Sequence, residues 1–218
     1  MDLEKSRIFN PGPLLAAAGV LAFSALLVAE IVNFSADTVK YRLGRPKEIV
    51  CTGRAVISNV ENVIRADRID IAGGDLDVAK CYKNVRIVSL ASGLQLRSDY
   101  VEFYQKTDYI RLLRRPVLTM KDLLIVSDAM ERYNARKLSV IQGETVITRS
   151  NMDVRCRIGR YDELKEVVVL KGAPDVRFRK ANDEPLRNAF TCGEIVFFNT
   201  NKRLILDKDV KGKIFFDE

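Results

Sequence analysis

A valine recurs through this chain at nearly regular intervals. The intervals are 29, 32, 29, 30 and 34 residues, and the valines are Val56, Val85, Val117, Val146, Val176 and Val210. A unit of about 30 residues is too short to bury an apolar face alone, so such units stack and share one core. The recurrence therefore predicts an elongated repeat architecture with atypical units at its two ends.

Polar and apolar residues alternate within the units. Leu94 to Ser98 and Met152 to Ile158 follow a period of two, which is typical of half-buried strands. Runs such as Val167 to Leu170 add β-branched residues, and no apolar stripe with helical spacing follows Val50. We therefore expect an all-β domain in which each unit supplies three strands.

A small residue followed by aspartate opens the second strand of several units. These pairs are Ala66-Asp67, Ser98-Asp99 and Ser127-Asp128. A row of carboxylates can bind a metal, but regularly repeated aspartates more often end strands or accept hydrogen bonds from turn amides. We expect this structural role, with no metal and no cofactor.

The N-terminal segment has the composition of a membrane signal. No charged residue lies between Ile8 and Ala29, and residues 13–34 span roughly 33 Å as a helix, against a hydrocarbon core of about 30 Å. A cleaved signal peptide is the alternative, although Leu27 and Phe34 are poor residues at the minus-three position. We predict an anchor or signal at 1–36, a linker at 37–47 and a β-domain at 48–218.

Composition excludes several classes of active site. The chain contains no histidine, which removes histidine-based triads and histidine-ligated zinc. Its cysteines form no C-x-x-C pair; disulfides Cys51–Cys81 and Cys156–Cys192, or four buried thiols, both remain open. The net charge is +7, but the sequence contains no recognisable nucleic-acid-binding motif. No pair of Asp or Glu residues stands out from the others as a candidate for acid–base catalysis. We expect neither an enzyme nor a nucleic-acid-binding protein.

The strand repeats, preceded by a membrane segment, resemble a known family. Gly53-Arg-Ala-Val56 and Ser98-Asp-Tyr-Val101, with their counterparts in other units, resemble the OstA-like domain of the lipopolysaccharide transport proteins LptA and LptC. The resemblance covers about residues 48–216. It implies an open, twisted β-jelly roll whose groove holds the acyl chains of lipopolysaccharide or a related glycolipid.

The resemblance also implies partners and a location. Such jelly rolls join edge to edge with other OstA-like proteins, and the anchored LptC role includes docking on the membrane subunits of the Lpt ABC transporter. Because an anchor through residues 13–34 is favoured, we expect a single-pass inner-membrane protein with its C-terminal domain in the periplasm. A soluble LptA-like bridge subunit and a membrane-tethered, bactofilin-like β-solenoid scaffold are the alternatives.

Alternation gives candidate groove and edge residues. The predicted inward side chains are Val85, Ile87, Leu94, Leu96, Val101, Phe103, Ile110, Leu112, Val117, Leu124, Val126, Val140, Val146, Val154, Ile158, Val169, Val176, Phe178, Phe197 and Leu204. A shift of one residue would turn a whole strand's set outward. The first and last strands are expected to offer unpaired edges, and the candidates there are Ile49, Val50, Val56, Ile57, Ile214, Phe215 and Phe216.

Overall fold

The computed structural model describes residues 33–213, apart from 43, 45, 59–61, 74–76, 91–92, 121–122, 150–151, 163, 179–187 and 199–202. Its elements are β1 (Asn33–Ser35), β2 (Thr38–Arg42), β3 (Lys47–Ser58), β4 (Asn62–Gly73), β5 (Val78–Ser89), β6 (Gln95–Tyr104), β7 (Tyr109–Leu113), β8 (Val117–Met120), β9 (Leu123–Val126), β10 (Ala129–Tyr133), the 3-10 helix η1 (Asn134–Arg136), β11 (Leu138–Arg149), β12 (Met152–Asp162), β13 (Val167–Lys171), β14 (Asp175–Phe178), β15 (Asn188–Thr191), β16 (Glu194–Phe198), β17 (Arg203–Asp207) and β18 (Lys211–Lys213). The all-β prediction is confirmed for these residues.

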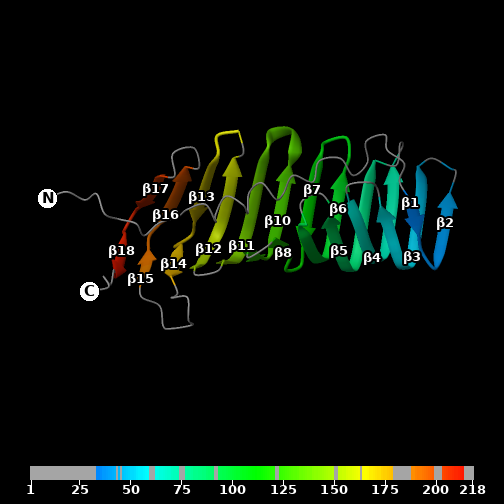
Figure 1. Ribbon diagram of the computed structural model, residues 1–218. Helices are drawn as coiled ribbons and strands as arrows, with labels where there is room; N and C mark the ends of the chain where they lie inside the picture. Colours follow the sequence, from blue (N-terminus) through cyan, green and yellow to red (C-terminus); the bar gives the residue numbers. More distant parts are fainter. Residues whose placement is uncertain are drawn as a thin grey trace.

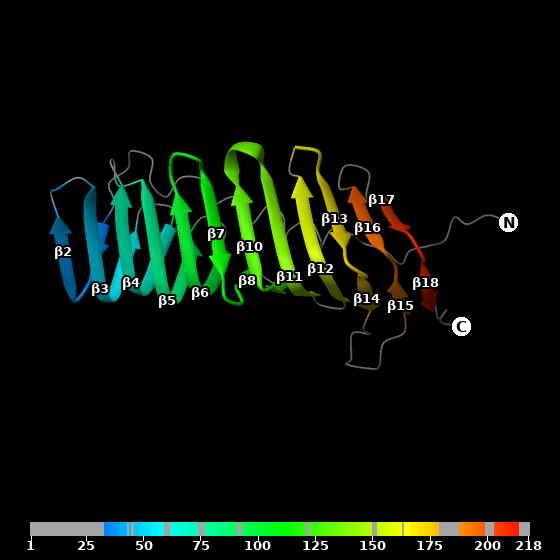
Figure 2. The same ribbon diagram turned by 180° about the vertical axis from the view of Figure 1, so that it is seen from behind.

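The strands form an elongated body of two antiparallel layers (Figure 1). Layer A has the order β2-β3-β4-β5-β6-β7-β10-β11-β12-β13-β16-β17, and layer B has the order β1-β3-β4-β5-β6-β8-β9-β11-β12-β14-β15-β18. The long strands β3, β4, β5, β6, β11 and β12 belong to both layers. Figure 2 shows the same progression from behind, with β2 at one end and β17 and β18 at the other.

Long strands can serve both layers because each bends at a corner. In β3 and β11 the pairing register shifts beside Gly53 and Gly143, whose φ angles of +73° and +84° suit glycine. Asp128 lies against the second corner and accepts a hydrogen bond from the Glu144 backbone N–H at 2.8 Å. The structural role predicted for Asp128 is therefore confirmed.

The inner faces of the two layers meet in one apolar core. Residues paired across neighbouring strands share a face, so the pairings define rows of side chains along the body. From β3 to β14, one inner row of layer B consists of aliphatic side chains with exposures of 0–5%, namely Ile57, Ile64, Ile87, Leu96, Leu118, Ile125, Ile147, Val154 and Val176.

The β-domain begins before the predicted boundary at Glu48. β1 and β2 both pair with β3, although they lie in the segments predicted as anchor and linker. Residues 1–32 are outside the described part of the chain. Among the residues that are described, no helix has the length and hydropathy needed to cross a bilayer.

The predicted N-terminal edge is wrong. Ile49, Val50, Val56 and Ile57 lie on β3, which pairs with β4 on one side and with β1 and β2 on the other. Sequence analysis missed β1 and β2 because it assigned their residues to the anchor and linker. The C-terminal edge candidates, Ile214, Phe215 and Phe216, lie outside the described residues.

The four cysteines are buried free thiols. Cys51 on β3 and Cys81 on β5 are separated by Ile69 on β4, and two strand spacings amount to about 10 Å, too far for a disulfide. Burial raises the pKa of the Cys81 thiol to about 12 and that of Cys156 to about 11. The sequence left open either two disulfides or four buried thiols, and the structure shows four buried thiols.

Candidate functional site

The interior between the layers is the first candidate site. Many of the predicted groove side chains lie there with exposures of 0–6%: Val85, Ile87, Leu94, Leu96, Val101, Phe103, Ile110, Leu112, Val154 and Val176. Phe178 is half-buried and packs against the same core. The strands carrying Phe197 and Leu204 are described, but their side chains are not among the described ones.

Several predicted groove residues point outward instead. Their strand neighbours occupy the interior, so the predicted parity is wrong at Val117, Leu124, Val126, Val140, Val146, Ile158 and Val169. Uninterrupted runs such as Leu123–Val126 have no alternation that would identify the inner face. In β12 the corner at Cys156 reverses the parity, so Val154 is buried whereas Ile158 is 47% exposed.

The described interior side chains are buried along most of the body and less covered at its N-terminal end. Phe34 on β1 lies opposite Ile57, and Val39 and Tyr41 on β2 lie opposite inner-facing residues of β3. These three side chains are 45%, 52% and 54% exposed. An apolar ligand therefore meets accessible apolar side chains at this end.

A buried arginine interrupts the inner face of layer A. Arg132 on β10 is paired with Ile110 on β7 and Ser139 on β11, and it is only 1% exposed. Its guanidinium donates a hydrogen bond to the Ser139 hydroxyl at 2.9 Å. Sequence analysis did not single out Arg132, but its alternation with Met130 places both side chains on one face.

Comparison with known proteins finds a similar solved structure but no matching family model and no matching curated protein. One similar solved structure is LptH, the LptA-homologous periplasmic component of the lipopolysaccharide transport device of Pseudomonas aeruginosa. The identity is 9%, the match covers 86% of this chain and 96% of LptH, and the TM-score is 0.25. A likeness at that score supports no argument about function.

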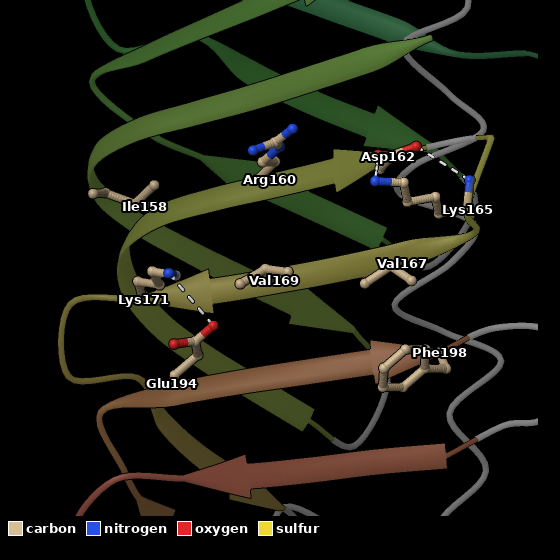
Figure 3. A pocket seen from close by; sticks show the side chains of 9 residues that line it. All are labelled: Ile158, Arg160, Asp162, Lys165, Val167, Val169, Lys171, Glu194 and Phe198. Carbon is tan, nitrogen blue, oxygen red and sulfur yellow. Dashed lines mark hydrogen bonds and ion pairs between the residues drawn. The ribbon is translucent and has the colours of Figure 1, made fainter.

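A second candidate site is a depression on the outer face of layer A. It has a volume of about 550 Å³ and lies over β12, β13 and β16 (Figure 3). Its apolar lining comes from Ile158, Val167, Val169 and Phe198, with Val167 directly opposite Phe198. Ile158 and Val169 point away from the interior, and on the outer face of layer A they line this depression.

Charged side chains surround this apolar lining. Asp162 pairs with Lys165 at 3.6 Å, and Glu194 pairs with Lys171 at 3.5 Å and Lys208 at 2.9 Å. The hydrogen bond from Lys208 is the main cause of the lowered pKa of Glu194, and it holds that carboxylate in its charged form. Both carboxylates thus have cationic partners, so the depression can bind an apolar group but has no obvious acid or base for catalysis.

Among the residues that the structure describes, acidic side chains such as Asp67 and Asp128 have structural partners rather than the grouping of a metal centre. No group of three or more Cys, Asp or Glu side chains in the described parts of the chain is arranged to hold a metal ion. Asp67 instead accepts a hydrogen bond from the Asn84 side chain at 3.0 Å, next to the corner of β5. The repeated aspartates at Asp67 and Asp128 therefore act on neighbouring strands.

Proposed function

We propose that this chain carries lipopolysaccharide or a related glycolipid across the periplasm, with the acyl chains held between layers A and B. The observation that supports this most is the uninterrupted aliphatic row of layer B, which runs from Ile57 to Val176. An acyl chain buried there gains about 25 cal/mol for each Å² of apolar surface removed from water. Binding on this scale needs no catalytic group.

The repeat supports movement of the lipid along the body. Successive strands present Ile, Leu or Val at the same row position, so an acyl chain meets similar surroundings at each step. A path without a strongly preferred position allows transfer in small steps. The exposed Phe34, Val39 and Tyr41 are the proposed contact point at the N-terminal end.

The unpaired edges support assembly into a longer path. Among the described strands, β2 pairs with β3 alone in layer A, and β17 pairs with β16 alone. A strand of another OstA-like jelly roll, or of the transporter's membrane subunits, can add to such an edge by main-chain hydrogen bonds. The proposal includes anchoring through residues 13–34 in the inner membrane, with a cleaved, soluble bridge subunit as the alternative.

Lipid contact can be tested with two adjacent leucines. Leu112 faces the interior and is 1% exposed, whereas Leu113 faces the outside of layer A. A leucine analogue bearing a diazirine, introduced at one position at a time, preserves the size of either side chain. Photocrosslinking to lipopolysaccharide at Leu112 and not at Leu113 is expected; equal crosslinking, or crosslinking at Leu113 alone, contradicts the proposal.

Edge assembly can be tested with paired cysteines. Thr38→Cys on β2 and Asp207→Cys on β17 both lie on edges of layer A, and the native thiols are buried. A short bifunctional thiol reagent is expected to join two chains through this pair. Thr38→Cys with Lys211→Cys, which lies on the layer B edge strand β18, is the control. Equal crosslinking of both pairs contradicts edge-to-edge assembly with matched layers.

A further inference from the structure

Three arginines lie side by side on the outer face of layer B. Arg65 on β4 is paired with Arg86 on β5, and Arg86 is paired with Arg97 on β6. All three are exposed. Because neighbouring strands are about 4.8 Å apart, three cationic side chains are gathered within roughly 10 Å. We call these residues the arginine row.

Within the described part of the chain, the arginine row has no acidic ion-pair partners. The outer face of layer A differs, because Lys80 pairs with Glu102 there at 3.9 Å and Arg111 pairs with Glu131 at 3.6 Å. Like charges directly opposite each other in a sheet are destabilising, which favours a polyanionic ligand for this row.

Apolar side chains continue the same face. Arg97 is paired with Val117 on β8, which is followed by Val126 on β9 and Val146 on β11. Val146 and the neighbouring Leu124 are each 37% exposed. A cationic region therefore adjoins an accessible aliphatic region on one surface.

We propose that the outer face of layer B docks on an anionic lipid bilayer. The arginine row binds the phosphates of the headgroups, and Leu124 and Val146 contact the interfacial region beside them. A bilayer fits both halves of this surface, whereas free phosphate or a nucleic-acid backbone fits only the arginines. This surface is separate from the interior, so the proposal does not depend on transport of a glycolipid.

The test measures contact at this face rather than total membrane binding. The full chain receives one environment-sensitive fluorophore, on Thr119→Cys of layer B or on Gln142→Cys of layer A, since the native thiols are buried. Vesicles of phosphatidylcholine alone are compared with vesicles containing phosphatidylglycerol. The N-terminal segment is common to all samples, so it does not affect the comparison.

The fluorophore at Thr119 is expected to shift to shorter wavelength with vesicles that contain phosphatidylglycerol, and this shift is lost at high salt. No shift is expected with phosphatidylcholine vesicles or for the fluorophore at Gln142. Arg65→Gln/Arg86→Gln/Arg97→Gln should weaken this response about 100-fold, since each basic residue near an anionic surface contributes about fivefold. Lys40→Gln/Arg136→Gln/Arg160→Gln removes the same charge elsewhere and should weaken it far less.

Three outcomes overturn the proposal. Equal weakening by the two triple variants shows that net charge alone is responsible. A response from the Gln142 label that equals or exceeds that of the Thr119 label places the contact on another face. Displacement of the vesicles by millimolar inorganic phosphate at constant ionic strength shows a free-phosphate site. Circular dichroism of each variant confirms that the β-fold is retained.

Discussion

Arg132 donates a hydrogen bond to Ser139 across β10 and β11, inside a core that is otherwise largely apolar. Each side chain is almost fully buried, so neither can exchange its partner for water. A buried polar group that loses its partner costs about 1–3 kcal/mol of stability. This pair therefore contributes to the specificity of packing at the centre of layer A.

We predict that Arg132→Met lowers the free energy of unfolding by about 1–3 kcal/mol, because the Ser139 hydroxyl is left without this donor. Arg132→Met/Ser139→Ala should recover part of the loss, since it removes the unsatisfied group as well. Urea unfolding followed by circular dichroism measures both changes. A double variant less stable than Arg132→Met would show that the hydroxyl does not depend on this arginine.

Substitutions at adjacent positions of β9 test the corrected parity. Ile125 is 1% exposed and Leu124 is 37% exposed. Ile125→Ala should destabilise the fold by about 2–5 kcal/mol through loss of a buried side chain. Leu124→Ala, which faces outward, should cost well under half as much. Thermal unfolding of the two variants decides the parity, and the reverse order of stability would contradict the pairing of β8, β9 and β11.

The corner in β11 should tolerate no side chain at Gly143. A Cβ there would collide with Asp128, and its φ of +84° is unfavourable for alanine. Gly143→Ala should therefore cost more than about 2 kcal/mol. Gly93→Ala is the control, because Gly93 has a φ of +69° but no atom within 4 Å of the added Cβ. Equal losses in chemical denaturation would mean that contact with Asp128 has no effect.

Stability should decline at alkaline pH. The Cys81 thiol has a folded pKa of about 12 against an ordinary value of 9.0, because burial disfavours the thiolate. Below pH 9 the Cys81 thiol is protonated in both the folded and the unfolded chain, and its contribution to stability is fully present. Above pH 9 the thiol ionises first in the unfolded chain. The free energy of unfolding then falls by up to 1.36 kcal/mol per pH unit until about pH 12. Cys81→Ala should show a shallower decline between pH 9 and 11 in thermal unfolding. An identical slope would contradict this origin.

The same burial predicts slow thiol chemistry. A thiol-reactive disulfide reagent needs the thiolate and access to it, and all four cysteines are buried with raised pKa values. Reaction of the folded chain at neutral pH should be far slower than reaction in denaturant. Rapid release of the coloured thiol product from the folded chain would contradict the packing described for these residues.

The sequence predicts the class of fold better than the faces of its strands. Period-two alternation and recurring valines were sufficient for an all-β stack, because both depend on local pattern. Alternation fixes a face only between corners, however, and a corner such as that at Cys156 separates the buried Val154 from the exposed Ile158. Marker valines therefore occur on both faces, as Val85 and Val146 show.

Partner strands were also beyond sequence analysis. Arg65, Arg86 and Arg97 are far apart in the chain, and only the pairing of β4, β5 and β6 brings them together. The edge at β1 and β2 was missed because their residues adjoin a long apolar run that dominates the local signal. Which residues of different strands lie side by side depends on how all the strands pair, and not on the sequence of any single strand.

The long strands β3, β4, β5, β6, β11 and β12 each contribute to both layers. Each added pair of such strands therefore extends the two layers together and leaves the cross-section unchanged. Insertion or loss of a complete unit would change the length of the molecule and leave its width unchanged. Evolution or design can thus adjust span independently of the lining, which is a freedom that a closed barrel does not offer.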